Sequence, residues 1–91
     1  MLIVNQDKNS IINFKNINFI KIESSENKFD IEMNYDGDYW DVIGTYDSYE
    51  RSQKILIEIT QEFKKVARVD TQGNRNPRFY TIPRVYYMPE K

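Results

Sequence analysis

The chain has 91 residues, a formal net charge of −1 and neither cysteine nor histidine, which excludes disulfides, thiolate nucleophiles, imidazole bases and the usual zinc ligand sets. Its length predicts one domain over residues 1–91 with a modest core. The start, MLIVNQDK, lacks the pattern of a secretory signal and no segment is apolar enough to span a membrane, so we expect a cytoplasmic protein.

The first half of the chain is predicted to form short strands joined by polar turns. The clearest pattern is the alternation of Phe29, Ile31 and Met33 with polar residues, and the Asp-Gly pair that follows at 36–37 is typical of a tight hairpin turn. Strict alternation in the next strand places Trp40, Val42, Gly44 and Tyr46 on one side and Ile43 on the other. The predicted strands cover residues 2–4, 10–14, 17–23, 28–35 and 39–46.

A long helix is predicted over residues 48–68. Asp47 and Ser48 can each cap its first turn, and Asp47 with Glu50 forms a capping-box pair. A rotation of 100° per residue gathers an apolar face for packing on the sheet. Ile57 lies on the opposite, polar side, as an isolated exposed residue or as an anchor for a partner or a second copy. The apolar face contains Ile55, Leu56, Ile59, Phe63, Val66 and Ala67.

One more strand is predicted after a polar loop at residues 70–77. It covers residues 78–88 and contains Pro83, which cannot donate to a ladder and therefore indicates an edge strand or a bulge. The predicted fold class is α+β: an antiparallel β-meander of about five to six strands, with one long helix packed on one face and the final strand after the helix.

Charge and aromatic residues make the C-terminal part the candidate binding region. Residues 1–50 hold four lysines and ten acids, whereas residues 51–91 hold nine basic residues, including every arginine, and four acids. Guanidinium groups beside planar rings suit a ligand that carries phosphate and a base. The alternative is that the aromatic residues pack under the helix while the arginines cover an edge or neutralise the acidic half. The candidate ligand-binding residues are Arg68, Arg75, Arg78, Tyr80, Arg84 and Tyr86.

Other kinds of chemistry find little support in the sequence. Asp36, Asp38 and Asp41 lie close together, but no complete calcium loop surrounds them, and no nucleophile or phosphate-loop motif is present. A pI near 5.4 argues against binding long nucleic acid. We therefore predict no enzyme, no catalytic residues, no metal site and no cofactor.

Three segments resemble a group of small uncharacterised proteins of low-GC Gram-positive bacteria and their phages: the opening VNQDKNSIINFKNI, the central GTYDSYERSQKIL and the closing YYMP. The resemblance covers the chain end to end, except for residues 70–77. It implies no known activity or site residues. It does imply a phage or prophage context, in which small accessory proteins without enzymatic motifs are often inhibitors of host antiviral defence.

These observations lead to a first hypothesis of a non-enzymatic, phage- or prophage-encoded inhibitor of bacterial defence. It could sequester an anionic, nucleotide-derived signal, with a pocket formed between copies of a homo-oligomer, or it could cap a defence protein such as a CRISPR effector. The alternative is a structural or regulatory interaction module that self-assembles and binds no small ligand. A third hypothesis is a weak metal-dependent hydrolase that uses acidic residues.

Overall fold

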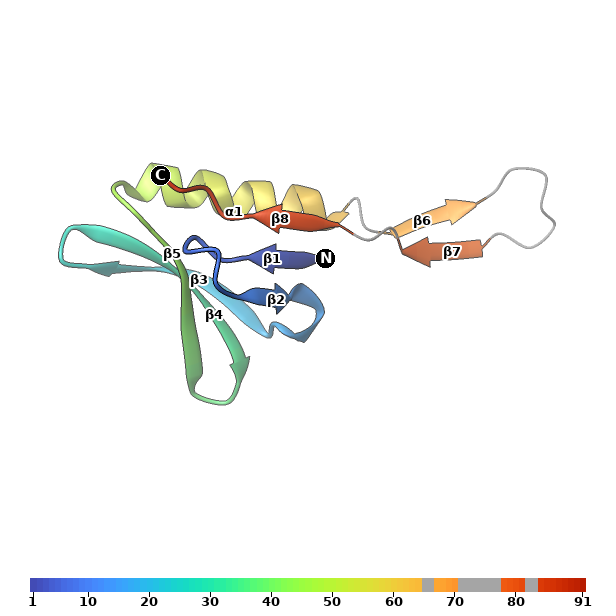
Figure 1. The fold of residues 1–91 in the computed structure, drawn as a ribbon, viewed down its shortest axis with the longest axis horizontal. Coiled ribbons are helices and arrows are strands. Elements are labelled where there is room, and N and C mark those ends of the chain that lie inside the picture. The colour runs from blue at the N-terminus through green and yellow to red at the C-terminus, as the bar shows by residue number, and fades with distance from the viewer. Residues whose placement is uncertain (65–66, 71–77, 82–83) are drawn as a thin grey trace.

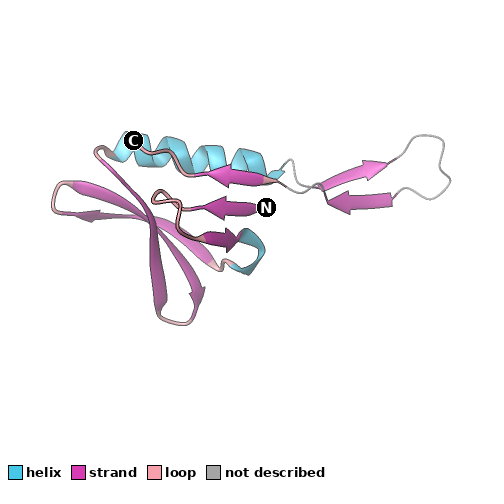
Figure 2. Cartoon of the chain, in the orientation of Figure 1, coloured by secondary structure: helices cyan, strands magenta, loops and turns pink. Residues whose placement is uncertain are grey.

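The computed structural model describes residues 1–64, 67–70, 78–81 and 84–91, with backbone alone over 67–70 and 78–81. Figures 1 and 2 show one α-helix among the described residues, strands before and after it, and hence the expected α+β class. The elements in chain order are β1 (Leu2–Val4), β2 (Ile11–Asn13), the 3-10 turn η1 (Phe14–Asn16), β3 (Phe19–Ser25), β4 (Lys28–Asp36), β5 (Tyr39–Tyr46), α1 (Tyr49–Lys64), β6 (Ala67–Asp70), β7 (Arg78–Thr81) and β8 (Val85–Tyr87).

The described strands divide among separate small sheets, so the expectation of one continuous meander is wrong. One sheet has the order β2–β1–β8, a second has the order β3–β4–β5, and β6 pairs with β7 as a hairpin (Figure 1). β8 pairs in parallel with β1, with Leu2 opposite Val85. The last strand therefore joins the first strand of the chain, and this long-range pairing is what divides the expected sheet.

Helix α1 begins as expected but ends earlier. The Ser48 hydroxyl accepts a hydrogen bond from the backbone N–H of Arg51 at 3.1 Å, so Ser48 is the capping residue. The Asp47 carboxylate pairs with the Lys28 ammonium instead. The predicted end at residue 68 is wrong, because Ala67–Asp70 pair with β7 as a strand and their backbone groups bond across the hairpin.

The core is one cluster to which both three-stranded sheets and the helix contribute. Ile55 and Ile59 are buried, which confirms the centre of the predicted helical face. Phe63 remains 43% exposed, and its ring packs against Phe14 with centroids 4.9 Å apart. The expectation that Phe63 is a core residue is therefore wrong. The buried cluster contains Ile3, Ile12, Ile31, Met33, Ile43, Tyr46, Ile55, Ile59 and Met88.

A β-bulge in β5 reverses part of the expected alternation. Ile31 pairs with Gly44 and Glu32 with Val42, so Ile43 is the extra residue. Ile43 is consequently buried, while Val42 is 44% exposed. The prediction that Val42 shares a side with Tyr46 is therefore wrong, because the bulge inserts one residue between them.

Gln6 joins the two three-stranded sheets. Its side-chain carbonyl accepts from the Thr45 N–H at 2.7 Å, and its amide group donates to the Thr45 carbonyl at 3.0 Å. The same amide nitrogen donates to the Glu90 carbonyl at 2.8 Å, and the Gln6 N–H donates to the Ile43 carbonyl at 2.8 Å. Gln6, which follows β1 closely in the chain, thus forms hydrogen bonds both to the edge of β5 and to the C-terminal segment.

Candidate functional site

Two of the six predicted ligand-binding residues, Arg84 and Tyr86, lie against the helix. Arg84 Nη1 donates to Glu62 Oε2 at 2.9 Å, and the Tyr86 hydroxyl donates to Glu58 Oε2 at 2.8 Å. Residues i and i+2 of a strand lie ~6.6 Å apart and residues i and i+4 of a helix ~6 Å apart. Alternate side chains at β8 therefore meet successive turns of α1.

The surroundings of these two side chains hold them to the helix. Burial, together with the hydrogen bond to Glu58, raises the pKa of the Tyr86 hydroxyl above its usual value, so the hydroxyl remains a donor at neutral pH. Arg84 Nε is buried and has no hydrogen-bond partner among the described residues. An anionic ligand at this place would have to compete with the Glu58 and Glu62 carboxylates.

The other four predicted ligand-binding residues belong to the hairpin region. Arg68 lies in β6, Arg78 and Tyr80 lie in β7, and Arg75 falls in 71–77, outside the described residues. The Cα register pairs Arg68 with Tyr80 and Asp70 with Arg78. The side chains of β6 and β7 also lie outside the described part of the structure, so their role as ligand-binding residues stays a prediction.

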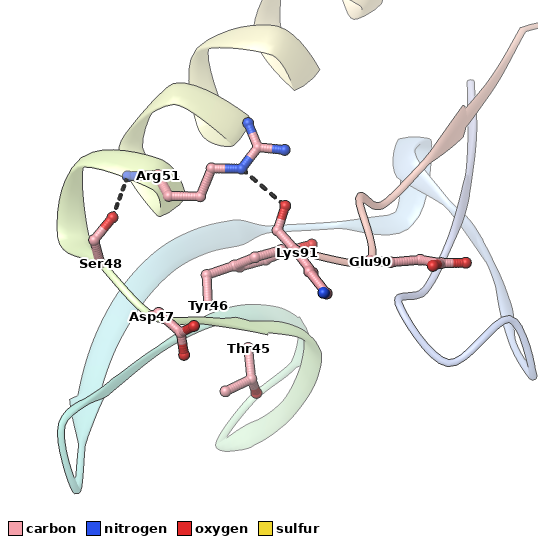
Figure 3. Close-up of a pocket in the computed structure, with 7 residues that line it drawn as sticks. All are labelled: Thr45, Tyr46, Asp47, Ser48, Arg51, Glu90 and Lys91. Carbon is pink, nitrogen blue, oxygen red and sulfur yellow. Dashed lines mark hydrogen bonds between the residues drawn. The ribbon is translucent and has the colours of Figure 1, made fainter.

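A polar hollow of about 350 Å³ lies where β5 leads into α1 (Figure 3). Arg51 Nε crosses it to donate to the main-chain oxygen of Lys91 at 3.0 Å. The hydrogen bond of Lys28 to Asp47 and that of Lys8 to Glu90 lower the pKa values of these two carboxyl groups. The hollow carries charges of both signs and favours neither an anion nor a cation. Its lining residues, Thr45, Tyr46, Asp47, Ser48, Arg51, Glu90 and Lys91, include none of the predicted ligand-binding residues.

A second hollow, of about 370 Å³, lies along α1 around Ile57. Ile57 is 54% exposed, in agreement with its predicted place on the polar side of the helix. Its lining is Gln53, Leu56, Ile57, Thr60, Gln61 and Lys64. A single exposed isoleucine among polar neighbours is common on protein surfaces, so the role of Ile57 in an interface stays a prediction.

The most distinctive surface group is an aromatic platform formed by Phe19, Lys21 and Trp40. The Phe19 and Trp40 rings meet edge to face with centroids 5.8 Å apart, and the Lys21 ammonium lies 4.3 Å from the centre of the Trp40 ring. Phe19 is 59% exposed and Trp40 36% exposed. The Trp40 indole is therefore held between two neighbours while remaining accessible to solvent.

The register of the β3–β4–β5 sheet positions this platform. A two-residue turn with positive φ at Glu26 and Asn27 joins β3 to β4. That turn sets Phe19 opposite Asn34, and Asn34 in turn pairs with Trp40. Asn34 is 7% exposed, and its amide donates to the Gly37 and Tyr39 carbonyls at 2.8 and 2.9 Å. The buried amide ties the β4–β5 turn to the strand that supports the two rings.

Carboxylates surround the platform. The Lys21 ammonium lies 3.3 Å from a Glu23 carboxylate oxygen and 3.9 Å from a Glu32 carboxylate oxygen. Asp36 and Asp38 are exposed at the β4–β5 turn, which projects away from α1 in Figure 1. Over the described residues no three acidic side chains gather closely enough to hold a metal ion. The platform thus combines two rings with the Lys21 ammonium, and the carboxylates of Glu23, Glu32, Asp36 and Asp38 outnumber that one cation and form an acidic border.

The aromatic platform is not among the sites predicted from the sequence, because strict alternation groups Trp40 with Tyr46 and takes no account of the bulge at Ile43. A usable signal was the short Glu26–Asn27 turn, since a two-residue turn fixes the pairing of the strands on either side of it. Applied along both strands, that pairing places Phe19 next to Asn34 and, through β5, next to Trp40.

No family model, curated protein or solved structure matches this chain. Among the described residues no helix is both long and apolar enough to cross a membrane.

Proposed function

We propose that this chain is a non-enzymatic binding protein that covers a basic surface of another protein with its aromatic platform. The observation that carries the proposal is the Trp40 ring, which Phe19 and Lys21 hold in place while it stays 36% exposed. Tryptophan is among the residues that contribute most to protein interfaces, because a large rigid ring loses little entropy on binding. Trp40 is thus suited to be the central anchor of an interface.

The charge around the platform supports a basic partner. Glu23 and Glu32 share the sheet face with the platform, and Asp36 and Asp38 extend the acidic border to the β4–β5 turn. Complementary charge at the rim of an interface accelerates association and excludes partners of the wrong sign. Lysine and arginine groups of the partner would pair with this border while an apolar or aliphatic group meets Trp40.

Proteins that act on nucleic acids present such basic surfaces, since they neutralise backbone phosphates. Combined with the phage or prophage context implied by the resemblance, this supports an inhibitor of antiviral defence that caps a nucleic-acid-processing effector, such as a CRISPR effector. The bound inhibitor would occupy the surface that the effector uses for its nucleic acid. Inhibition then requires no catalytic residue in this chain.

The test is a plaque assay on host strains with and without a nucleic-acid-targeting defence system, with the chain expressed from a plasmid. Expression should restore plaque formation on the defended strain, and Trp40→Ala should abolish this effect. Tyr49→Ala, which removes another exposed ring at the start of α1, is the matched control and should behave as the wild type. Restoration by Trp40→Ala at wild-type protein level would remove the platform from the mechanism.

A binding measurement with the purified effector complements the plaque assay. Affinity should fall at least about 30-fold for Trp40→Ala, as expected for a central anchor worth about 2 kcal/mol or more. The association rate should fall with added salt, because the acidic border steers a basic partner. A rate indifferent to salt would contradict the assigned partner chemistry.

Sequestration of a nucleotide-derived anion is the second candidate function. The Cα register that pairs Arg68 with Tyr80 supports it, since it makes an arginine and a tyrosine position direct neighbours across the two strands. Arg84 and Tyr86 are already hydrogen-bonded to carboxylates of α1, which argues against a role for them in binding a nucleotide-derived anion. Calorimetry against cyclic nucleotides and ADP-ribose decides: no heat with any of them would exclude the candidate, and binding that is lost in Arg68→Ala would support it.

A further inference from the structure

The outer face of the β2–β1–β8 sheet is apolar across all three strands. On the inner side, Ile3 and Ile12 are buried in the core and Tyr86 is half-buried. The alternate residues point away from the core and form two rows, set by the register of the two pairings. The rows are Asn13–Leu2–Val85 and Ile11–Val4–Tyr87, and their six residues are the outer apolar face.

The outer apolar face is largely uncovered. Leu2 is 39% exposed, Val85 48%, Tyr87 65% and Ile11 69%. These four side chains together leave on the order of 400 Å² accessible, which is as large as the greatest apolar patch of a typical monomer. Parallel strands such as β1 and β8 are normally covered on both faces, and here the described residues cover one.

We propose that a second copy of the chain covers the outer apolar face, giving a two-fold symmetric dimer. An interface about a two-fold axis must be complementary to itself, and an uncharged apolar surface meets this condition in every register. The two rows contain no charged residue, and they therefore satisfy this condition.

The dimensions also fit a dimer. Two outer apolar faces bury on the order of 800 Å² between them, about half of a standard interface, which is the size range of a weak, concentration-dependent dimer. Small sheets pack face to face at a spacing of about 10 Å with their side chains interdigitated. With the two-fold axis along β1, Val4 faces Val4 of the second copy, and Ile11 faces Tyr87 of the second copy.

This dimer is independent of the proposed capping function, because the outer apolar face and the aromatic platform share no residue. A failure of either proposal therefore leaves the other standing. If both hold, each dimer carries two platforms and can engage a repetitive partner with higher apparent affinity than a single chain.

Light scattering after size exclusion tests the proposal over low to high micromolar concentrations. The wild type should show twice its chain mass of 11.0 kDa, and Ile11→Lys combined with Tyr87→Lys should show the chain mass. Both positions are at least 65% exposed, so the isolated fold should tolerate lysine there, which circular dichroism verifies. Tyr49→Lys, a matched change at an exposed ring on α1, should keep the dimer.

A cysteine cross-link locates the axis and does not depend on the lysine variants folding. Facing sheets lie about 10 Å apart, too far for a direct disulfide, so a short bismaleimide serves as the cross-linker. The chain has no cysteine, so Val4→Cys provides a single thiol, which this reagent should join into a covalent dimer while Tyr49→Cys remains a monomer under the same conditions. A wild type that is monomeric throughout, a dimer that survives the double lysine change, or a dimer lost in Tyr49→Lys would each overturn the proposal. Failure of Val4→Cys to cross-link would overturn the assigned axis.

Discussion

Replacing Gln6 with alanine tests how the two three-stranded sheets are held together. The change removes three side-chain hydrogen bonds, of 2.7 and 3.0 Å to the Thr45 backbone and 2.8 Å to the Glu90 carbonyl, and leaves the Gln6 main chain in place. Each such bond contributes about 0.5–1.5 kcal/mol to stability. Since Gln6 is half-buried and water can reach part of the site, we expect a loss of about 2 kcal/mol.

Urea denaturation of the two proteins measures this loss. For a domain of this size, about 2 kcal/mol lowers the unfolding midpoint by about 10 °C, so thermal unfolding gives a second reading. Gln53→Ala is the control, because Gln53 is an exposed glutamine on α1 and its change should stay within about 0.5 kcal/mol. A Gln6→Ala loss as small as that of the control would mean that packing alone joins the sheets.

A charged variant, Gln6→Glu, refines the test through its pH dependence. A carboxylate can accept from the Thr45 N–H but cannot donate to the Thr45 and Glu90 carbonyls, so this protein should be no more stable than Gln6→Ala at neutral pH. In the folded state the glutamate side chain of this variant lies next to the Thr45 and Glu90 carbonyl oxygens, and their partial negative charge raises the pKa of its carboxyl group. Its stabilising bonds are therefore present below the unfolded pKa of about 4.3 and lost as the pH rises through the folded value. A stability difference between Gln6→Glu and Gln6→Ala that does not change from pH 3 to pH 7 would contradict this account.

Three further changes probe other parts of the fold. Ser48→Ala should cost about 1 kcal/mol in urea denaturation, whereas Asp47→Ala should cost clearly less, because Ser48 is the cap; the reverse order would restore Asp47 to that role. Gly44→Ala should cost about 1–3 kcal/mol in thermal unfolding, because its methyl carbon would lie 2.8 Å from the Tyr46 ring; an unchanged midpoint would show that the ring moves aside freely. Burial raises the pKa of Tyr46 to about 12, against about 10 in the unfolded chain, so its stabilising contribution is complete below pH 10 and lost as the pH rises toward 12. When the pH is raised from below 10 to above 10, the urea midpoint should therefore fall less for Tyr46→Phe than for the wild type. An equal fall of the midpoint in the two proteins would refute this role of Tyr46.

Local patterns predicted the elements better than their pairing. The alternation around Ile31 and Met33 and the burial of Ile55 and Ile59 are confirmed, since each depends on the period of a single strand or helix. The pairing of β8 with β1 joins residues from opposite ends of the chain, and no local period encodes such a contact. One indication was present: the run Leu2–Val4 is apolar at every position, as strands with two apolar faces are.

The boundaries failed where tertiary contacts override local preference. The apolar period of α1 continues past Lys64, but Ala67 bonds across the hairpin to β7 instead. The bulge at Ile43 shifted the alternation by one residue and so misplaced Val42. The number of arginines in the C-terminal part led to the prediction of a binding site there. The contacts of Arg84 with Glu62 and of Tyr86 with Glu58 could not be predicted, because they depend on how β8 lies beside α1.

The parallel pairing of β1 with β8 has a consequence for how the protein is made. During synthesis, the segment that carries Ile3 emerges long before Met88 and the strand that precedes it, and must wait for them to pair. Closing so long a loop is slow, because its entropy must be lost before any contact compensates for it. A nascent chain stalled before residue 85 would hold Leu2–Val4 beside β2 with one edge open, and we expect it to be far more sensitive to protease than the finished protein.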